Sequence, residues 1–381
     1  MKLDPLRIEL GLLDRLAHFY GIRLGRVLAA LGSMGPRYYL RVNTLRCNRE
    51  ELVEEMARLL GRVSGDENLE DAAYLPVHEK NIQPQGTLVE ADRFAAEAVL
   101  QGAHLYAQGV RRCHKLKAGS KATVVDERGN VAGVGVARQG ETSILTHRQG
   151  LAVEVQENRF GLPSLMETEW YEKGQIHLQS LPAMVTCRVL GPKPGELIAD
   201  LNCAPAGKMS YLSQLTGNKA RIVGFDRNAR KLEKARRQLE RLGCQNYQLV
   251  KHDSRYVHMD YSLRPDRVLV DPPCTGLGVT PKLFVDTTAK DVDDLSSYQK
   301  QFLTAASHIV KPGGVIVYSV CTITREECED VARFGADELG LELDMAVPMM
   351  GRPGFDADGV TQRFDPDIDG CGYFIARFHK N

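Results

Sequence analysis

The sequence lacks a net charge and any hydrophobic run long enough to cross a membrane. Its 381 residues balance 49 Lys and Arg against 49 Asp and Glu, and none of its apolar runs approaches the roughly 20 residues of a membrane span. Because the field of the whole chain does not favour a polyanion, a nucleic acid must be held by local basic patches. The start, "MKLDPLRIELGLLDRL", has no export-signal pattern, so we interpret it as a helix of the mature protein.

The nine cysteines include no Cys-x-x-Cys pair and no Cys/His cluster. Their odd number and scattered spacing argue against a disulfide framework and against a zinc site, so we expect no metal. Free thiols are typical of a reducing compartment, and the sequence therefore predicts a cytoplasmic protein. The composition points to no membrane and to no obligate protein partner, and the length favours two or three domains.

The pattern of the sequence changes twice along the chain. Residues 1–85 begin with a helical leucine period, and "RYYLRVNTLRCNREELVEEMARLL" then predicts a strand, a turn capped by Asn48 and an amphipathic helix, which together indicate a small α+β domain. Residues 86–165 start with a short helix in "EADRFAAEAVLQGAHLYAQGV". The brief strands "KATVVDE", "VAGVGVA" and "LAVEVQE" follow, separated by "RGN" and by a polar, hairpin-like segment. Short strands with glycine turns favour a compact β-barrel.

Strands and helices alternate in residues 166–381. Five apolar segments predict strands: "ELIADL", "RIVGFD", "YQLVKHD", "DRVLVDPP" and "GVIVYSV". Near-continuous apolar strands separated by helices indicate an α/β domain with a parallel sheet covered on both faces. "GYFIARF" near the end predicts a last strand, and the antiparallel edge of the sheet is one place for it.

Four of the five strands end in an acid or next to one: Asp200, Asp226, Asp253 and Asp271. Ligands of open α/β sheets bind at the carboxyl ends of the strands, where Asp226 is placed to accept hydrogen bonds from a ribose diol. The loop "DLNCAPAGKMSYLSQL" matches neither the phosphate-binding nor the dinucleotide glycine pattern. Helix capping would explain one such acid, but four with a small-residue loop favour an adenosine-type ligand. Without a phosphate cradle, S-adenosylmethionine fits better than a nucleotide.

Two cysteines follow the fourth and fifth strands, Cys274 in "DPPCTGLG" and Cys321 in "YSVCT". Either one alone would be interpreted as a buried thiol. Together they suit carbon methylation of a pyrimidine, because a thiolate that adds to C6 of cytosine makes C5 nucleophilic. A base must then remove the C5 proton so that the thiol is released. Asp271, Cys274 and Cys321 can supply the carboxyl group at N3, the nucleophile and the releasing group.

These motifs resemble the Sun-type family of RNA cytosine-5 methyltransferases. "DLNCAPAGK", "DPPCTGLG" and "YSVCT" occur in the order of that family, and "LRVNTLRCNREEL" is similar to its upstream segment. "EADRFAAEAVLQGAHLYAQGV" and the strands after it look like an inserted PUA domain, as in the branch that methylates tRNA in the acceptor stem beside the CCA end. The resemblance implies a PUA domain at 86–165, a class I (Rossmann-like) methyltransferase domain at 166–381, S-adenosylmethionine as cofactor and tRNA as substrate.

The resemblance also implies roles for single residues. Cys321 becomes the nucleophile, Cys274 assists product release, and Asp271 hydrogen-bonds the base, with Lys208 close to both the cofactor and the base. The residues implied to bind S-adenosylmethionine are Asn202, Cys203, Ala204, Pro205, Ala206, Gly207, Lys208, Asp226 at the ribose, Lys231, Asp253 at the adenine, and Asp271.

The sequence departs from the family pattern at five positions. Asn202 and Cys203 replace the usual Cys-Ala of the cofactor loop. Ala206 stands for the first glycine of the cofactor loop, and alanine resists a positive φ. Val320 replaces the usual threonine before the nucleophile, and Cys371 is unexpected near the C-terminus. We expect these changes to affect efficiency more than the type of reaction.

Basic residues gather in "RRCHKLKAGSK" (111–121), which holds five Lys and Arg and no acid. A solvated loop and a phosphate-facing patch are equally good interpretations of this run. The candidate RNA-binding residues there are Arg111, Arg112, Lys115 and Lys117. Tyr106 is a further candidate, because it could stack on an unpaired base at an RNA end.

Two alternatives to a tRNA methyltransferase stay open. The same chemistry could act on ribosomal RNA, since the catalytic motifs do not read the substrate. The chain could also be an RNA-binding assembly factor with an inactive methyltransferase domain. The intact pair of cysteines argues against this second alternative, because an inactive domain has no need of both.

Overall fold

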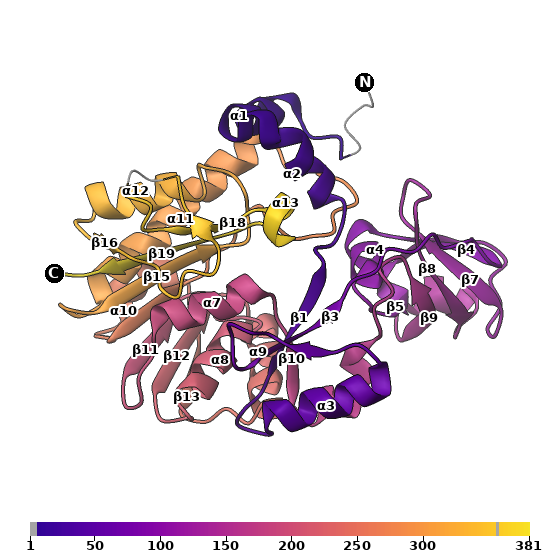
Figure 1. Ribbon diagram of the computed structural model, residues 1–381, viewed down its shortest axis with the longest axis horizontal. Helices are drawn as coiled ribbons and strands as arrows, with labels where there is room; N and C mark the ends of the chain where they lie inside the picture. Colours follow the sequence, from indigo (N-terminus) through magenta and orange to yellow (C-terminus); the bar gives the residue numbers. More distant parts are fainter. Residues whose placement is uncertain (1–5, 356–357) are drawn as a thin grey trace.

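The computed structural model describes residues 6–355 and 358–381 and arranges them around three sheets (Figure 1). The largest sheet has the strand order β13-β12-β11-β14-β15-β19-β18-β17. All five predicted strands are present and pair in parallel. They are β11 (Leu197–Asp200), β12 (Arg221–Asp226), β13 (Tyr247–Lys251), β14 (Arg267–Val270) and β15 (Val315–Val320).

Helices cover both faces of this sheet, as the apolar strands predict. Val315 and Val317 pack into one core with α7 (Leu181–Leu190), α8 (Gly207–Leu215) and α9 (Ala229–Arg241). Ile316 and Tyr318 point the other way, into a core with α10 (Val257–Asp260), α11 (Ala289–Ile309) and α12 (Glu329–Asp337). The strand order reverses between β11 and β14, and ligands of such sheets bind at that point.

The last predicted strand, β19 (Tyr373–His379), is antiparallel to β15 but does not form the edge of the sheet. β16 (Glu342–Asp344) and β18 (Gln362–Phe364) both pair with it, and β17 (Arg352–Pro353) pairs with β18. The edge prediction is therefore wrong. Strands of two or three residues are too short to show an alternating pattern, so they could not be predicted.

The middle of the chain forms a six-stranded sheet in the order β5-β9-β8-β7-β4-β6. Its strands are β4 (Thr87–Ala91), β5 (Leu105–Tyr106), β6 (Val110–Cys113), β7 (Lys121–Val125), β8 (Val131–Ala137) and β9 (Leu151–Asn158), and α4 (Arg93–Leu100) covers it. The polar, hairpin-like segment proves to be a helix, α5 (Glu141–His147). Only Ile144 of α5 is buried, so it lacks the apolar stripe that reveals a helix in sequence.

The N-terminal part contributes a four-stranded sheet in the order β10-β1-β3-β2. Its members are β1 (Arg37–Val42), β2 (Ser64–Gly65), β3 (Ala72–Pro76) and β10 (Ile176–Leu178), with α3 (Arg49–Leu60) beside them. The Asn48 side chain caps α3, as predicted, by accepting the N–H of Glu51 at 3.2 Å. β10 comes from the segment after residue 166, so this sheet is completed from outside 1–85. The division at 85 and 165 stays a prediction.

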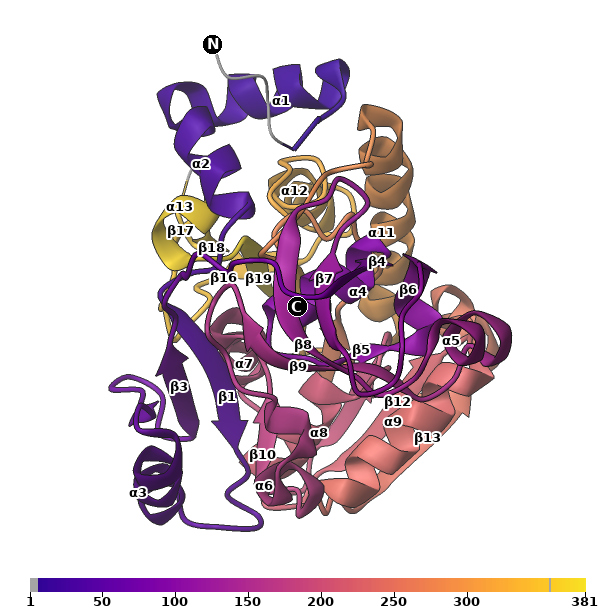
Figure 2. The same cartoon turned by 90° about the vertical axis from the view of Figure 1, so that its right-hand side faces the viewer.

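Two further N-terminal helices pack on the large domain rather than on this sheet. α1 (Leu10–Tyr20) and α2 (Leu24–Leu31) lie above α12 and α13 (Pro366–Asp369) in Figures 1 and 2. Leu12, Leu16 and Leu31 share a core with Leu277 and Ile323, which follow β14 and β15. The expected N-terminal helix is therefore present from Leu10, and residues 1–5 lie outside the described part. Among the described residues, no helix combines the length and apolarity needed to cross a bilayer.

Candidate active site

The loop after β11 leads from a buried acid to the start of α8. Asp200 is buried and accepts the N–H of Asn202 at 3.2 Å, and burial raises the pKa of its carboxyl group to about 7. The loop ends at Ala206, whose φ is +75°. Alanine thus adopts the left-handed backbone that glycine would take without strain, and its methyl group is fully buried. The departure from the family pattern leaves the turn at the start of α8 in place.

A cavity of about 130 Å³ lies at the ends of β11, β12 and β13. Asn202, Asp226, Lys231 and Asp253 line it, so the structure brings these four predicted residues together. The Asn202 Oδ1 atom is buried and has no hydrogen-bond partner among residues 6–355 and 358–381. A buried acceptor needs a donor. The hydroxyl and amino groups of an adenosine supply such donors, so this site fits the predicted cofactor.

Asp226 and Asp253 differ in how many of their carboxylate oxygens are already hydrogen-bonded within the protein. One oxygen of Asp226 accepts the N–H of Asn228 at 2.7 Å. Both oxygens of Asp253 are bound by the Arg255 guanidinium, at 2.9 and 2.6 Å, and this contact lowers the pKa of Asp253. The sequence interpretation did not foresee Arg255. Asp253 therefore has less capacity left for an adenine than Asp226 has for a ribose.

Lys208 and Asp271 form an ion pair between this cavity and the cysteines. The Nζ of Lys208 lies 2.7 Å from Oδ2 of Asp271, and Ser319 donates to Oδ1 at 2.7 Å. Burial disfavours the charge of Lys208, but Asp271 and Tyr373 outweigh it and hold the lysine pKa well above its ordinary value. Lys208 therefore stays protonated and holds the Asp271 carboxylate in one orientation.

The two cysteines at the ends of β14 and β15 face each other. The Sγ atoms of Cys274 and Cys321 are 3.5 Å apart. This contact, helped by the charges of Lys208 and Lys282, lowers the pKa of Cys321. The same contact and burial raise the pKa of Cys274 well above its ordinary value. Cys321 is therefore the thiol of the pair that ionises first.

Glu327 is a residue of the site that the sequence interpretation missed. It is fully buried and reaches both cysteine loops. Its carboxylate accepts five hydrogen bonds, from the N–H and hydroxyl of Thr275, the hydroxyls of Thr322 and Thr324, and the amide of Gln299. Thr275 follows Cys274 and Thr322 follows Cys321, so one side chain fixes the two loops relative to each other. In the sequence Glu327 is one acid in the run "REECED" and carries no sign of burial.

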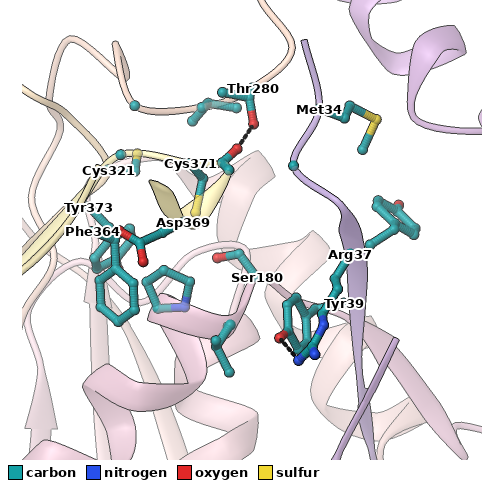
Figure 3. Close-up of a pocket in the computed structure, with 18 of the residues that line it drawn as sticks. Met34, Arg37, Tyr39, Ser180, Thr280, Cys321, Phe364, Asp369, Cys371 and Tyr373 are labelled. Carbon is teal, nitrogen blue, oxygen red and sulfur yellow. Dashed lines mark hydrogen bonds between the residues drawn. The ribbon is translucent and has the colours of Figure 1, made fainter. Parts of the chain in front are cut away.

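A second, larger cavity of about 530 Å³ opens beside Cys321. Figure 3 shows Cys321, Tyr373 and Cys371 on one side of it, and Arg37 and Tyr39 of β1 on the other. Burial raises the pKa of Cys371 to about 12, so this unexpected thiol stays protonated. The cavity is the space from which a base could reach Cys321.

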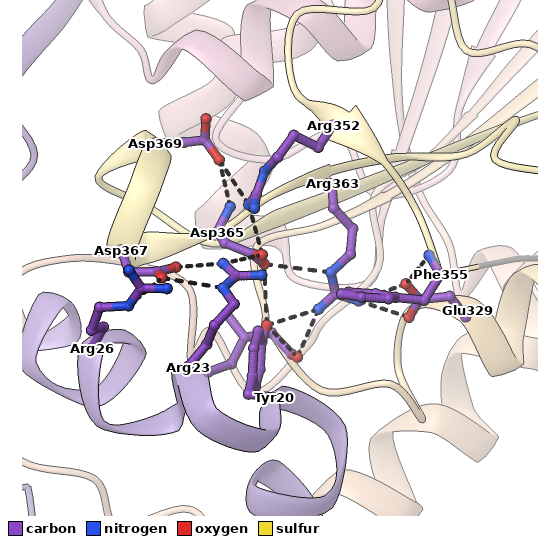
Figure 4. A network of polar contacts seen from close by, with 11 residues as sticks. Tyr20, Arg23, Arg26, Glu329, Arg352, Phe355, Arg363, Asp365, Asp367 and Asp369 are labelled. Carbon is purple, nitrogen blue, oxygen red and sulfur yellow. Dashed lines mark hydrogen bonds and ion pairs between the residues drawn. The ribbon is translucent and has the colours of Figure 1, made fainter.

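A buried polar network supports the wall of this cavity (Figure 4). Arg363 is 1% exposed and donates to both oxygens of Glu329, at 2.8 and 2.7 Å. It also donates to the Ile323 carbonyl at 2.7 Å, two residues after Cys321, and to the Tyr20 hydroxyl at 3.1 Å. The network therefore joins the N-terminal helices to the loop that carries Cys321.

The predicted RNA-binding residues lie apart from the cysteines, and none of the five lines the cavity beside Cys321. Tyr106 is exposed on β5, and Lys115 and Lys117 are exposed in the loop after β6. Arg111 and Arg112 are paired with Glu127 and Glu90, at 2.9 and 2.5 Å. The basic run is thus partly neutralised by acids that are distant in the sequence.

The fold and the site define a class I S-adenosylmethionine-dependent methyltransferase joined to a PUA domain. Residues 187–379 match the family described as 16S rRNA methyltransferase RsmB/F, and residues 88–158 match the PUA domain. The chain belongs to the RsmB/F family, which is the Sun-type family that the motifs resemble.

Relatives match nearly the whole chain. A tRNA (cytosine(72)-C(5))-methyltransferase of Pyrococcus horikoshii is 37% identical over 93% of this chain and 92% of its own. The human tRNA (cytosine(72)-C(5))-methyltransferase NSUN6 is 27% identical over 87% of this chain and 84% of its own. The crystal structure of NSun6 from Pyrococcus horikoshii with SFG, an S-adenosylmethionine analogue, superposes with a TM-score of 0.89 at 35% identity, covering 98% of this chain and 99% of that one.

Proposed function

We propose that this protein methylates C5 of a cytosine in tRNA through a covalent bond between Cys321 and C6. The observation that carries the proposal is the pair of thiols 3.5 Å apart, beside the ion pair of Lys208 and Asp271. Relatives that match almost the full length are named for cytosine 72 of tRNA. We therefore propose the same cytosine, in the acceptor stem near the CCA end.

The chemistry divides between the cofactor and the chain. When bound, S-adenosylmethionine supplies the methyl group as a sulfonium. The Cys321 thiolate adds to C6, and the π electron pair of the C5–C6 double bond moves toward C5. Asp271, held by Lys208, hydrogen-bonds the base through a proton shared at N3. After methyl transfer a base takes the C5 proton, and the electron pair of the C5–H bond forms the C5–C6 double bond again. The bond between C6 and sulfur then breaks and leaves its electron pair on the Cys321 thiolate. Cys274, 3.5 Å from Cys321, assists this release.

The cofactor is bound by the loop 202–208 and by the acids at the strand ends. Asn202 and Asp226 hold the ribose, and Asp253 lies at the adenine. Lys231 lies in the same cavity, on α9. The unpaired Oδ1 of Asn202 supports the placement of the adenosine there.

The PUA domain binds the RNA away from the reacting base. Exposed Tyr106 stacks on an unpaired nucleotide, and Lys115 and Lys117 hold phosphates, with Arg111 and Arg112 weakened by their acidic partners. The end of a stem is where a base leaves its helix at least cost, which favours the acceptor stem. The nine free cysteines support a cytoplasmic localisation, because the cytoplasm keeps thiols reduced.

Transfer of a tritiated methyl group to separated tRNA and ribosomal RNA tests the proposal. We expect label in tRNA, at a single cytosine by bisulfite sequencing, and none with Cys321→Ala. Label only in ribosomal RNA would show that the substrate is ribosomal RNA and not tRNA. No label in either RNA would favour an RNA-binding assembly factor without methyltransferase activity.

A further inference from the structure

The cavity beside Cys321 is larger than one flipped base requires. Its volume is about 530 Å³. Most of its lining residues lie in the segments 34–39, 178–182, 278–280 and 364–373. A flat pyrimidine in contact with Cys321 fills only the end formed by the large domain. The opposite wall carries Arg37 and Tyr39 of β1, so the cavity reaches from Cys321 to the N-terminal sheet (Figure 3).

Arg37 is the one cation among the described residues that line this cavity, and Asp369 is the one acid. Asp369 is already engaged, because its Oδ2 accepts the N–H of Asp365 at 2.7 Å and lies 3.3 Å from the Arg352 guanidinium. The Arg37 side chain is 43% exposed. The charge of the cavity therefore favours an anion at the β1 end.

The surroundings of Arg37 hold it in place without using up its donors. Its guanidinium lies over the Tyr74 ring, 4.3 Å from the centroid, and its Nη1 is 3.3 Å from the Tyr39 hydroxyl and 3.4 Å from Asp66. Asp66 is 5% exposed and is fixed by the N–H groups of Asn68 and Leu69. The Nε and Nη2 donors of Arg37 have no partner among residues 6–355 and 358–381.

We propose that Arg37 binds a phosphate next to the flipped cytosine, so that β1 forms a subsite for the nucleotide that adjoins the target. The inference rests on the proposed function. A base leaves its stack by rotation about the backbone, so the flanking phosphates follow it to the mouth of the pocket. Lys208 is paired with Asp271 at 2.7 Å, whereas Arg37 pairs with Asp66 at 3.4 Å through Nη1 alone and keeps its Nε and Nη2 donors for a phosphate. Arginine presents a planar fork of donors that matches a phosphate.

Neutral phosphates in the RNA test this subsite. The probe is an acceptor-stem minihelix with cytosine 72, in which each phosphate beside the cytosine is replaced in turn by a methylphosphonate. For the unaltered protein we expect one replacement to raise KM about tenfold with little change in kcat. Arg37→Gln should raise KM for the unmodified RNA by a similar factor and should no longer respond to that replacement. The slope of log affinity against log salt should fall by about one.

Two variants serve as controls. Arg58→Gln removes an exposed arginine of α3 that does not line the cavity beside Cys321, and it should keep the response to the methylphosphonate. Arg37→Lys keeps the charge and should restore part of the affinity. Methyl transfer by the unaltered protein to the unmodified minihelix tests the proposed function by itself. If that transfer occurs and Arg37→Gln still responds to both replacements as the unaltered protein does, the subsite is overturned.

Discussion

Replacement of Glu327 by glutamine tests whether one buried carboxylate positions both cysteines. The carboxylate accepts five hydrogen bonds, three of them from hydroxyl groups on Oε2. Glutamine can keep an acceptor for the N–H of Thr275 and for Gln299, but its amide nitrogen must take the place of Oε2. A hydrogen bond to a charged group is worth about 1 kcal/mol more than a neutral one. We expect Glu327→Gln to lower the free energy of unfolding by about 2–3 kcal/mol.

The effect of Glu327→Gln on catalysis separates positioning from stability. A shift of about 1 Å in a reacting group costs on the order of 100-fold in rate, so we expect kcat in single-turnover methyl transfer to fall at least tenfold. KM for S-adenosylmethionine should stay the same, because Glu327 does not line the cofactor cavity. The charge of Glu327 helps to keep the pKa of Cys274 raised. Alkylation of Cys274 should therefore begin at a lower pH in the variant.

Glu326→Gln is the matched control, because Glu326 is the preceding residue and pairs with Arg15 outside the site. We expect it to keep kcat and the alkylation profile of the unaltered protein. If Glu327→Gln loses stability but keeps both kcat and the pH profile of Cys274 alkylation, Glu327 is a structural residue only and the positioning argument is wrong.

Three further changes test other parts of the site. Lys208→Met removes the positive charge that lowers the pKa of Cys321; methyl transfer should be lost, and alkylation of Cys321 should require a higher pH. Asp200→Asn should have a higher free energy of unfolding than the unaltered protein, as measured in urea titrations. The difference should grow by about 1.4 kcal/mol per pH unit from the ordinary carboxyl pKa up to about pH 7, and should then stay constant. The reason is that the folded state raises the carboxyl pKa from 3.8 to about 7, so the ionised acid destabilises only as pH rises between these values. Arg363→Met leaves Glu329 buried without its cation, and we expect a loss of about 3–5 kcal/mol in the same titrations.

Much of the fold was predictable because its elements leave strong patterns in the sequence. The central parallel strands are largely apolar, and every residue of β14 and β15 is buried. Elements with little apolar content or very few residues were not predictable. The helix at 141–147 buries one side chain, and β16, β17 and β18 have three residues or fewer.

The candidate site was predictable where neighbouring strand ends carry its residues. Cys274 and Cys321 follow β14 and β15, which pair in parallel, so their approach follows from the topology. Arg37 and Glu327 were not predictable in this way. Arg37 reaches the cavity because the N-terminal sheet docks on the large domain, and Glu327 is buried by loops that meet only in three dimensions. Neither position can be predicted from the sequence, because both depend on tertiary contacts between distant segments.

Trapping of the covalent intermediate tests the central claim most directly. Each cysteine is replaced by alanine in turn, and each variant is incubated with tRNA and S-adenosylmethionine and examined on a denaturing gel. We predict that Cys274→Ala accumulates a protein–RNA adduct that survives denaturation, because Cys321 still bonds C6 but release is slowed. Cys321→Ala should bind the cofactor and form no adduct. An adduct with Cys321→Ala and none with Cys274→Ala would contradict the account and exchange the roles of the two cysteines.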